Sequence, residues 1–227
     1  MDKRFWAIIG VIVVIFGGIL VFHSHNSSNT SKGSSQPTNH VEGNLNAKVT
    51  LLEYGDYQCP VCESYYQTVQ QVQQKYNDTV KFQFRNLPLP MHPNAFAGAR
   101  AAEAADLQGK FWQMHDALYD PQNYSEWAYD TAAQQVSSAN PMPYFKNYAK
   151  AIGLDVNKFQ TDFASMTVNN RINADVAAFK ATKQSEGTPS FFINGKYYSN
   201  SNFVDANGTP SLDAFTKVLD KALADNK

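Results

Sequence analysis

The chain has 227 residues, enough for one well-buried domain or for one domain that carries a sizeable insertion. Aromatic residues make up 13% of it, which excludes a generically disordered chain. The formal net charge is −1 and no long run of one sign occurs, so the concentrated Lys/Arg surface of a general nucleic-acid binder is absent.

An apolar run extends from Phe5 to Phe22 behind two basic residues. In a helix this run would span about 27 Å, close to the roughly 30 Å hydrocarbon core of a bilayer. A cleaved secretory signal peptide is the alternative, but the run ends without a clear Ala-x-Ala site. We therefore expect residues 1–22 to be a cytoplasmic N-terminus and a single-pass transmembrane signal anchor. Its positive charges would leave the rest of the chain on the extracytoplasmic side of the cell membrane.

Residues 23–44 are rich in Ser, Asn, Thr and Gly and are predicted to be a flexible linker. This segment holds His23, His25 and His40. They could bind a metal weakly, but solvated linker histidines are the favoured interpretation.

The ordered domain is predicted over residues 45–227. Apolar and β-branched residues predict a strand at 48–54 and a second strand at 80–85. Between them, residues 63–76 carry apolar residues on one helical face. The prolines of 87–93 then break the regular structure.

A mostly helical insertion is predicted from about 94 to 184. Its helical segments are expected at 95–107, 111–119, 126–136, 144–152, 156–163 and 169–183. Asn194-Gly195 between two apolar runs then predicts a β-hairpin at 190–198, because this dipeptide favours a type I′ turn. Ser211 is a plausible cap for a final amphipathic helix. The element order indicates an α/β fold, a mixed sheet with an inserted helical domain.

The two cysteines of the chain form the motif Cys59-Pro60-Val61-Cys62, between the first strand and its helix. A thiol is a nucleophile only as its thiolate, which the free N–H groups and the positive dipole end of a helix start favour. Pro60 suits the first turn, where its missing N–H costs nothing. The spacing therefore predicts an exposed nucleophile at Cys59 and a resolving thiol at Cys62, one turn further in.

Two structural alternatives exist for this motif. A static disulfide is one, but a ring this small constrains little of the unfolded chain. Half of a zinc site shared between chains is the other, since no further cysteine completes a site within the chain. The placement of CxxC between strand and helix favours redox chemistry, and we expect neither a cofactor nor a metal.

Two segments resemble the active-site segments of DsbA-family thiol–disulfide oxidoreductases in the thioredoxin superfamily. They are residues 51–62 (LLEYGDYQCPVC) and 186–196 (EGTPSFFINGK). His92, the Ala-rich helix after it and residues 109–112 (GKFW) also resemble the helical insertion of the Gram-positive, membrane-anchored branch. The resemblance covers roughly residues 45–225, and the two segments stand in the correct order.

This resemblance implies a thioredoxin fold interrupted by a helical domain. It implies a cis Pro189 that faces the disulfide, with an ordinary trans turn as the alternative. The Thr188 backbone would pair with an extended substrate as an added strand, and Pro60 and Val61 would belong to the same substrate-binding surface. Glu53 matches an acidic residue that assists proton transfer with the inner thiol. Its alternative role is a salt-bridged strand carboxylate.

The sequence departs from the best-known family pattern at Val61, where a His often stands. A His cation beside Cys59 would stabilise the thiolate, so valine predicts a weaker oxidant than the strongest members. The main hypothesis is a dithiol oxidase, with a membrane-anchored disulfide reductase as the enzymatic alternative. A non-enzymatic chaperone-like or metal-binding module is the third possibility.

The expected partners follow from this hypothesis. Unfolded or reduced exported proteins would be the substrates, and the resemblance implies a membrane quinone-linked partner for reoxidation. We expect no nucleic-acid partner. Since no second dimerisation domain is recognised, a dedicated isomerase is disfavoured and a monomer is expected.

Four further residues are weaker candidates. His115 could serve catalysis, but a packed helix histidine is favoured. Asp56, Tyr57 and Gln58 flank Cys59, and the sequence leaves open whether they tune it or touch the substrate.

Overall fold

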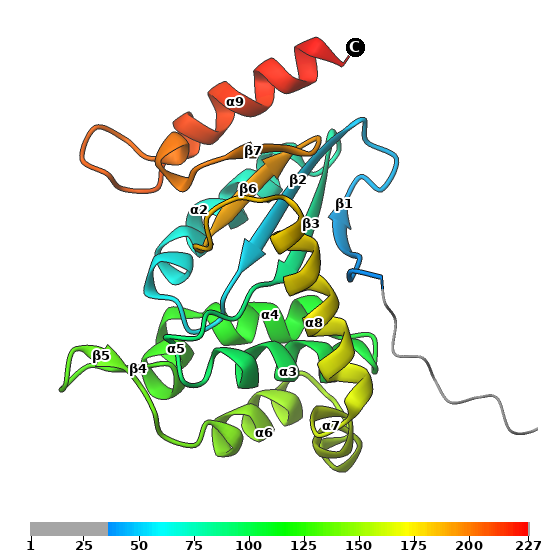
Figure 1. Ribbon diagram of the computed structural model, residues 1–227, viewed down its shortest axis with the longest axis vertical. Helices are drawn as coiled ribbons and strands as arrows, with labels where there is room; N and C mark the ends of the chain where they lie inside the picture. Colours follow the sequence, from blue (N-terminus) through cyan, green and yellow to red (C-terminus); the bar gives the residue numbers. More distant parts are fainter. Residues whose placement is uncertain (1–35, 227) are drawn as a thin grey trace, which may run out of the picture. The chain divides into compact units, whose positions relative to one another are not determined.

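The computed structural model describes residues 36–226 (Figure 1). The predicted anchor at 1–22 and most of the predicted linker lie outside these residues. Within 36–226, none of the helices combines the length and the apolar character that crossing a membrane requires.

A five-stranded sheet in the order β1-β3-β2-β6-β7 forms the centre of the described domain. Its strands are β1 (His40–Gly43), β2 (Val49–Gly55), β3 (Val80–Asn86), β6 (Ser190–Ile193) and β7 (Lys196–Tyr198). β2 and β3 pair in parallel, and the other three pairings are antiparallel. The parallel pair needs a crossover connection, which a helix supplies.

That crossover helix is α2 (Pro60–Tyr76), which packs with α9 (Leu212–Asp225) over one face of the sheet. The opposite face is covered by α8 (Met166–Ala181). There Phe179 of α8 packs edge-on against Tyr54 of β2, with ring centroids 5.1 Å apart. Residues therefore alternate between two apolar clusters along β2 and β6, as the period of two in a strand dictates.

A helical insertion enters between β3 and β6, and Figure 1 shows its helices gathered beyond the ends of β2 and β3. Besides α8 it contains α3 (Ala95–Asp106), α4 (Phe111–Tyr119), α5 (Pro121–Trp127), α6 (Met142–Ala151), α7 (Val156–Phe163) and a small hairpin of β4 (Tyr129–Asp130) and β5 (Gln135–Val136). A short 3-10 helix, η1 (Asn200–Phe203), leads from β7 to α9. The expected α/β fold with a helical insertion is confirmed.

The predicted helix at 126–136 is wrong. α5 begins earlier, because the Asp120 carboxylate caps it by accepting two backbone N–H groups of its first turn. It ends at Trp127, after which Tyr129 pairs with Val136 across the β4–β5 hairpin. Residues 129–136 of the predicted helix therefore form this hairpin instead.

The predicted linker is wrong at its C-terminal end, where His40–Gly43 forms the edge strand β1 on β3. His40 is 8% exposed, and its ring stacks on Phe111 with centroids 3.5 Å apart. Burial alone would lower the pKa of His40, but its hydrogen bonds to Asp106 and Glu103 raise it to about 9. The interpretation of His40 as a solvated histidine is therefore wrong, because two carboxylates of α3 hold it in the interior.

Candidate active site

Both cysteines lie at the start of α2, where the insertion meets the sheet. Cys59 is the N-cap residue, and Pro60 opens the helix. The backbone N–H of Glu63 donates the first helical hydrogen bond to the Cys59 carbonyl, at 3.1 Å. Both cysteines are free thiols in this structure. The free backbone N–H groups of the first turn therefore lie at the same end of α2 as Cys59, where they favour a negative charge on its sulfur.

The predicted exposure of Cys59 is wrong. Cys59 is only 4% exposed and Cys62 is 1% exposed. The chain at Thr188 lies across the outer thiol, whose Sγ is 3.6 Å from the Thr188 carbonyl oxygen. Pro60 and Val61 remain exposed, Val61 by 43%. Pro60 and Val61 therefore form the exposed surface next to the buried Cys59.

The two thiols differ strongly in acidity. The pKa of Cys59 is lowered to about 6, mainly by a hydrogen bond from the Cys62 thiol. Burial opposes this shift, whereas the Thr188 hydroxyl and the Cys62 backbone N–H favour the thiolate further. Burial raises the pKa of Cys62 well above its usual range. At neutral pH Cys59 is therefore a thiolate and Cys62 a thiol, which is the difference that their predicted roles need.

The second active-site segment lies opposite the helix start. Its Thr188–Pro189 peptide bond is cis, so the alternative of an ordinary trans turn is excluded. β6 begins pairing with β2 only at Ser190, which lies opposite Tyr54. Among residues 36–226, the buried Thr188 hydroxyl has no hydrogen-bond partner. It is available to donate to a sulfur anion at Cys59.

A buried ion pair stands beside the outer thiol. Asp56 is 1% exposed, and its carboxylate accepts the backbone N–H groups of Gln58 at 2.8 Å and Leu89 at 2.9 Å. The Nδ1 atom of His92 lies 2.6 Å from the same carboxylate. The Asp56 backbone carbonyl accepts the Cys59 N–H at 3.0 Å. Sequence reasoning quoted His92 only for its resemblance and gave it no role.

The residue just before the nucleophile is fastened to the insertion. Gln58 is fully buried, and its amide donates to the carbonyls of Ala128 at 3.1 Å and Ser137 at 2.6 Å. Its side-chain oxygen accepts the Asn94 N–H at 2.6 Å. The Tyr124 hydroxyl donates to the Gln58 backbone carbonyl at 2.8 Å. Every hydrogen-bonding group of this amide side chain is used, so Gln58 fixes the backbone that carries Cys59.

Tyr57 and His115 form a second buried pair. The Tyr57 hydroxyl lies 3.1 Å from the His115 Nδ1, and Tyr57 is 1% exposed. Burial lowers the pKa of His115 to about 3, so its ring is neutral. The ring packs edge-on against Phe84 and Trp112. The interpretation of His115 as a packed helix histidine is confirmed. Burial likewise excludes direct substrate contact by Tyr57, as it does by Asp56 and Gln58.

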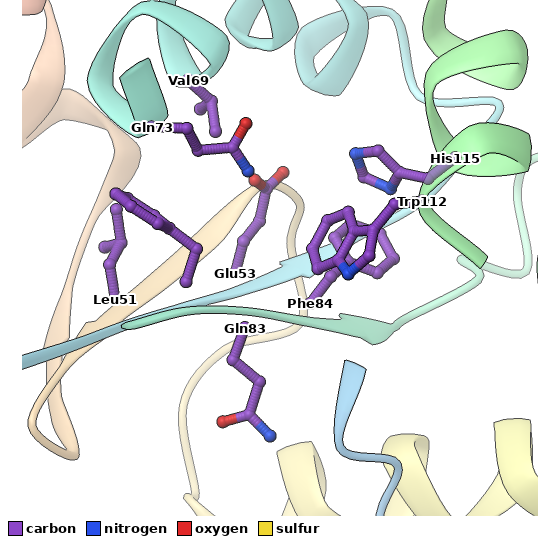
Figure 2. A pocket seen from close by; sticks show the side chains of 9 residues that line it. Leu51, Glu53, Val69, Gln73, Gln83, Phe84, Trp112 and His115 are labelled. Atoms are coloured by element: carbon purple, nitrogen blue, oxygen red, sulfur yellow. The ribbon is translucent and has the colours of Figure 1, made fainter. Parts of the chain in front are cut away.

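Glu53 lines a small cavity between β2, β3, α2 and α4, and Figure 2 shows its carboxylate pointing toward the Gln73 amide. The cavity measures about 20 Å³, which is large enough for about one water molecule, and it is also lined by Trp112 and His115. Burial, and after it the charge of Cys59, raises the pKa of Glu53 to about 8. Glu53 makes no ion pair with any residue of 36–226, which excludes the salt-bridged alternative there. Within the same residues, no cluster of three or more His, Cys, Asp or Glu side chains is placed to hold a metal.

Comparison with known proteins agrees with this geometry. A family model described as thioredoxin matches residues 35–221. A thioredoxin-like oxidoreductase from Silicibacter pomeroyi DSS-3 superposes with a TM-score of 0.63 at 25% identity, over 86% of this chain and 98% of that one. Oxidised BdbD from Bacillus subtilis superposes with a TM-score of 0.65 at 24% identity, over 83% and 96%. The described domain therefore has a thioredoxin-like fold with a helical insertion, and it carries a pair of thiols at the start of α2. The chain belongs to the thioredoxin family.

Curated relatives share sequence over part of their length. A Na(+)/H(+) antiporter NhaA 1 from Mycolicibacterium vanbaalenii is 35% identical over 159 residues, which is 69% of this chain and 23% of that protein. A Na(+)/H(+) antiporter NhaA 3 from Salinispora tropica is 34% identical over 180 residues, 79% and 25% of the two chains. This chain thus spans about a quarter of the length of these relatives, and their names describe the longer proteins.

Proposed function

We propose that the protein is a dithiol oxidase that introduces disulfides into exported proteins through Cys59 and Cys62. The observation that carries this proposal is the placement of Cys59 at the N-cap of α2, next to a buried Cys62 whose hydrogen bond lowers the pKa of Cys59 to about 6. A stable Cys59 thiolate favours the dithiol form and makes Cys59 a good leaving group. The disulfide form is then a better oxidant than one built from two ordinary thiols.

The reaction consists of two thiol–disulfide exchanges. A client thiolate attacks the Cys59 sulfur, a mixed disulfide forms, and Cys62 leaves as a thiolate. Glu53, whose pKa of about 8 keeps it protonated at neutral pH, supplies the proton that Cys62 takes up. A second client thiolate then attacks the client sulfur of the mixed disulfide and expels the Cys59 thiolate. The client loses two electrons, which the enzyme dithiol holds.

The client is held beside the sulfur by backbone pairing at Thr188. An extended client segment adds as a strand there, just beyond the point where β6 leaves its pairing with β2. The cis Pro189 directs the Thr188 backbone toward the start of α2. Pro60 and Val61 are exposed there and supply an apolar contact for the client. Backbone pairing depends little on client sequence, which suits varied unfolded proteins.

The setting of the reaction follows from the N-terminal sequence. Residues 1–22 anchor the chain in the cell membrane, and the following polar residues tether the catalytic domain on the extracytoplasmic side. A membrane quinone-linked protein takes the two electrons from the Cys59–Cys62 dithiol. The enzyme acts as a monomer, without a cofactor and without a nucleic-acid partner.

Redox titration of the full chain in detergent tests the direction of the reaction. We expect a reduction potential above the thioredoxin value of about −270 mV and below the value of about −120 mV of the strongest oxidants. A potential at or below about −270 mV would make the protein a reductase. Cys59→Ser should abolish oxidation of a reduced two-cysteine model protein, whereas the Cys59 thiolate of Cys62→Ser should attack the disulfide form of that protein and remain trapped as the mixed disulfide. Client folding that is unchanged in Cys59→Ser would favour the non-enzymatic module.

A further inference from the structure

The motif that carries the outer thiolate contains no cation, since Pro60 and Val61 separate the two cysteines. The charge of the buried Asp56 carboxylate acts on Cys59 instead. The charge of Asp56 raises the pKa of Cys59. It is a smaller cause than the Cys62 hydrogen bond, burial and the donors at Thr188 and Cys62. An unpaired buried carboxylate at this place would therefore oppose the anion that the chemistry needs.

His92 partners that carboxylate from the loop between β3 and α3. Its Nδ1 lies 2.6 Å from Asp56 Oδ2, and its side chain is 11% exposed. The same oxygen accepts the Leu89 N–H at 2.9 Å, and the His92 N–H donates to the Leu89 carbonyl at 3.1 Å. The loop is thus folded around the carboxylate, with the imidazole and one peptide N–H aimed at it.

The ionisable groups that act on His92 are Asp56, to which it is bonded, and Cys59 at the start of α2. The hydrogen bond to Asp56 raises the pKa of His92, burial opposes it, and the charges of Asp56 and Cys59 raise it further. Coupling between two sites is reciprocal. A histidine whose protonation is favoured by the Cys59 thiolate must, once protonated, favour that thiolate by the same free energy.

We propose that His92 is a positioning residue for the redox reaction, acting through Asp56 to stabilise the Cys59 thiolate with a positive charge that the motif itself lacks. This inference rests on the proposed function, because it assigns to His92 a part in setting the potential of the Cys59–Cys62 pair. His92 need not touch the client. It acts by cancelling the charge of Asp56 and by holding the loop at 87–93 beside the thiol.

The rate of Cys59 alkylation as a function of pH, measured on the full chain in detergent, separates this role from a merely structural one. His92→Asn keeps a hydrogen-bond donor near the Nδ1 position but removes the positive charge. We expect alkylation at pH 5 to slow by roughly threefold to tenfold, because the pKa of Cys59 rises. The double variant His92→Asn with Asp56→Asn removes both charges and should recover most of the rate.

Met91→Ala is the matched control, since Met91 is the 72% exposed neighbour in the same loop and carries no charge. It should leave the pH profile unchanged. A His92→Asn profile identical to that of the unmodified protein would overturn the proposal, even if thermal stability fell. If the unmodified protein itself shows an ordinary, slow thiol at Cys59, the proposed oxidase function fails instead, so the two failures are distinguishable.

Discussion

The Nε2 atom of His40 lies 2.7 Å from Glu103 Oε1, and the two side chains are 7% and 0% exposed. Its other ring nitrogen, Nδ1, lies 3.4 Å from Asp106. Since both ring nitrogens face carboxylates, His40 is held as a cation inside the domain. This contact joins the edge strand β1 to helix α3 of the insertion.

The ion pair predicts a stability that depends on pH. The folded-state pKa of His40 is about 9, above the value of about 6.5 in an unfolded chain. Its contribution is therefore fully present below about pH 6.5 and is lost as the pH rises through about 9. We expect a loss of roughly 3 kcal/mol in the free energy of unfolding over this range. Urea unfolding of the protein and of His40→Gln at each pH measures it. Parallel curves for the two proteins would contradict the assignment.

Removing the inner thiol should weaken the acidity of the outer one. The hydrogen bond from Cys62 is the largest cause of the lowered pKa of Cys59. Cys62→Ala removes this donor, so the pKa of Cys59 should rise by about one unit or more. Cys62→Ser keeps a hydrogen-bond donor, so its Cys59 pKa should lie between those of the unmodified protein and of Cys62→Ala. Iodoacetamide rates between pH 4 and pH 9 give the three values, and equal pKa values in all three proteins would refute the hydrogen bond.

Glu53 should control the attack of Cys62 on a mixed disulfide. This attack needs a deprotonated Cys62, and in the proposed mechanism the Glu53 carboxylate, whose pKa is raised to about 8, is the base. The rate should rise with pH up to about 8 or somewhat lower, because Cys59 carries no charge in the mixed disulfide. Glu53→Gln should slow the attack of Cys62 roughly a hundredfold at pH 7 and should abolish the rise of the rate with pH below about 8. Rapid-quench trapping of a Cys59–glutathione adduct follows this reaction alone. If the rate in Glu53→Gln still rose with pH in the same way, a residue other than Glu53 would be the base.

The buried amide of Gln58 should be essential for stability. Gln58→Glu replaces two donated hydrogen bonds, to Ala128 and Ser137, by oxygens that face carbonyls. We expect the free energy of unfolding to fall by about 2 to 5 kcal/mol. Gln71→Glu makes the same change on an exposed position of α2 and should cost less than about 0.5 kcal/mol. Urea unfolding compares them, and similar losses in the two variants would rule out a special role for Gln58.

The features that sequence reasoning predicted correctly depend on neighbours in the chain. Asn194 and Gly195 both have positive φ, as their hairpin turn demands, and the Ser211 side chain caps α9. The motif at Cys59 lies at a helix start because Pro60 favours that position. Each of these choices is decided within a few residues.

The errors involve partners that lie far apart in the sequence. His40 reads as a polar linker residue until Glu103, 63 positions later, is placed beside it. Cys59 reads as exposed until the loop at Thr188, 129 positions away, covers it. The pairing of Asp56 with His92 is of the same kind. A single sequence contains no periodicity that reports such contacts, so local patterns could not reveal them.

The attachment of Gln58 has a consequence for how a client is accommodated. The side chain next to the nucleophile is bonded to the hairpin base at Ser137 and to the start of α3 at Asn94. These hydrogen bonds fasten the start of α2 to the β4–β5 hairpin and to the start of α3. Cys59 is 4% exposed, so a client can reach it while these hydrogen bonds stay intact only if the loop that carries Thr188 and Pro189 moves away from the sulfur.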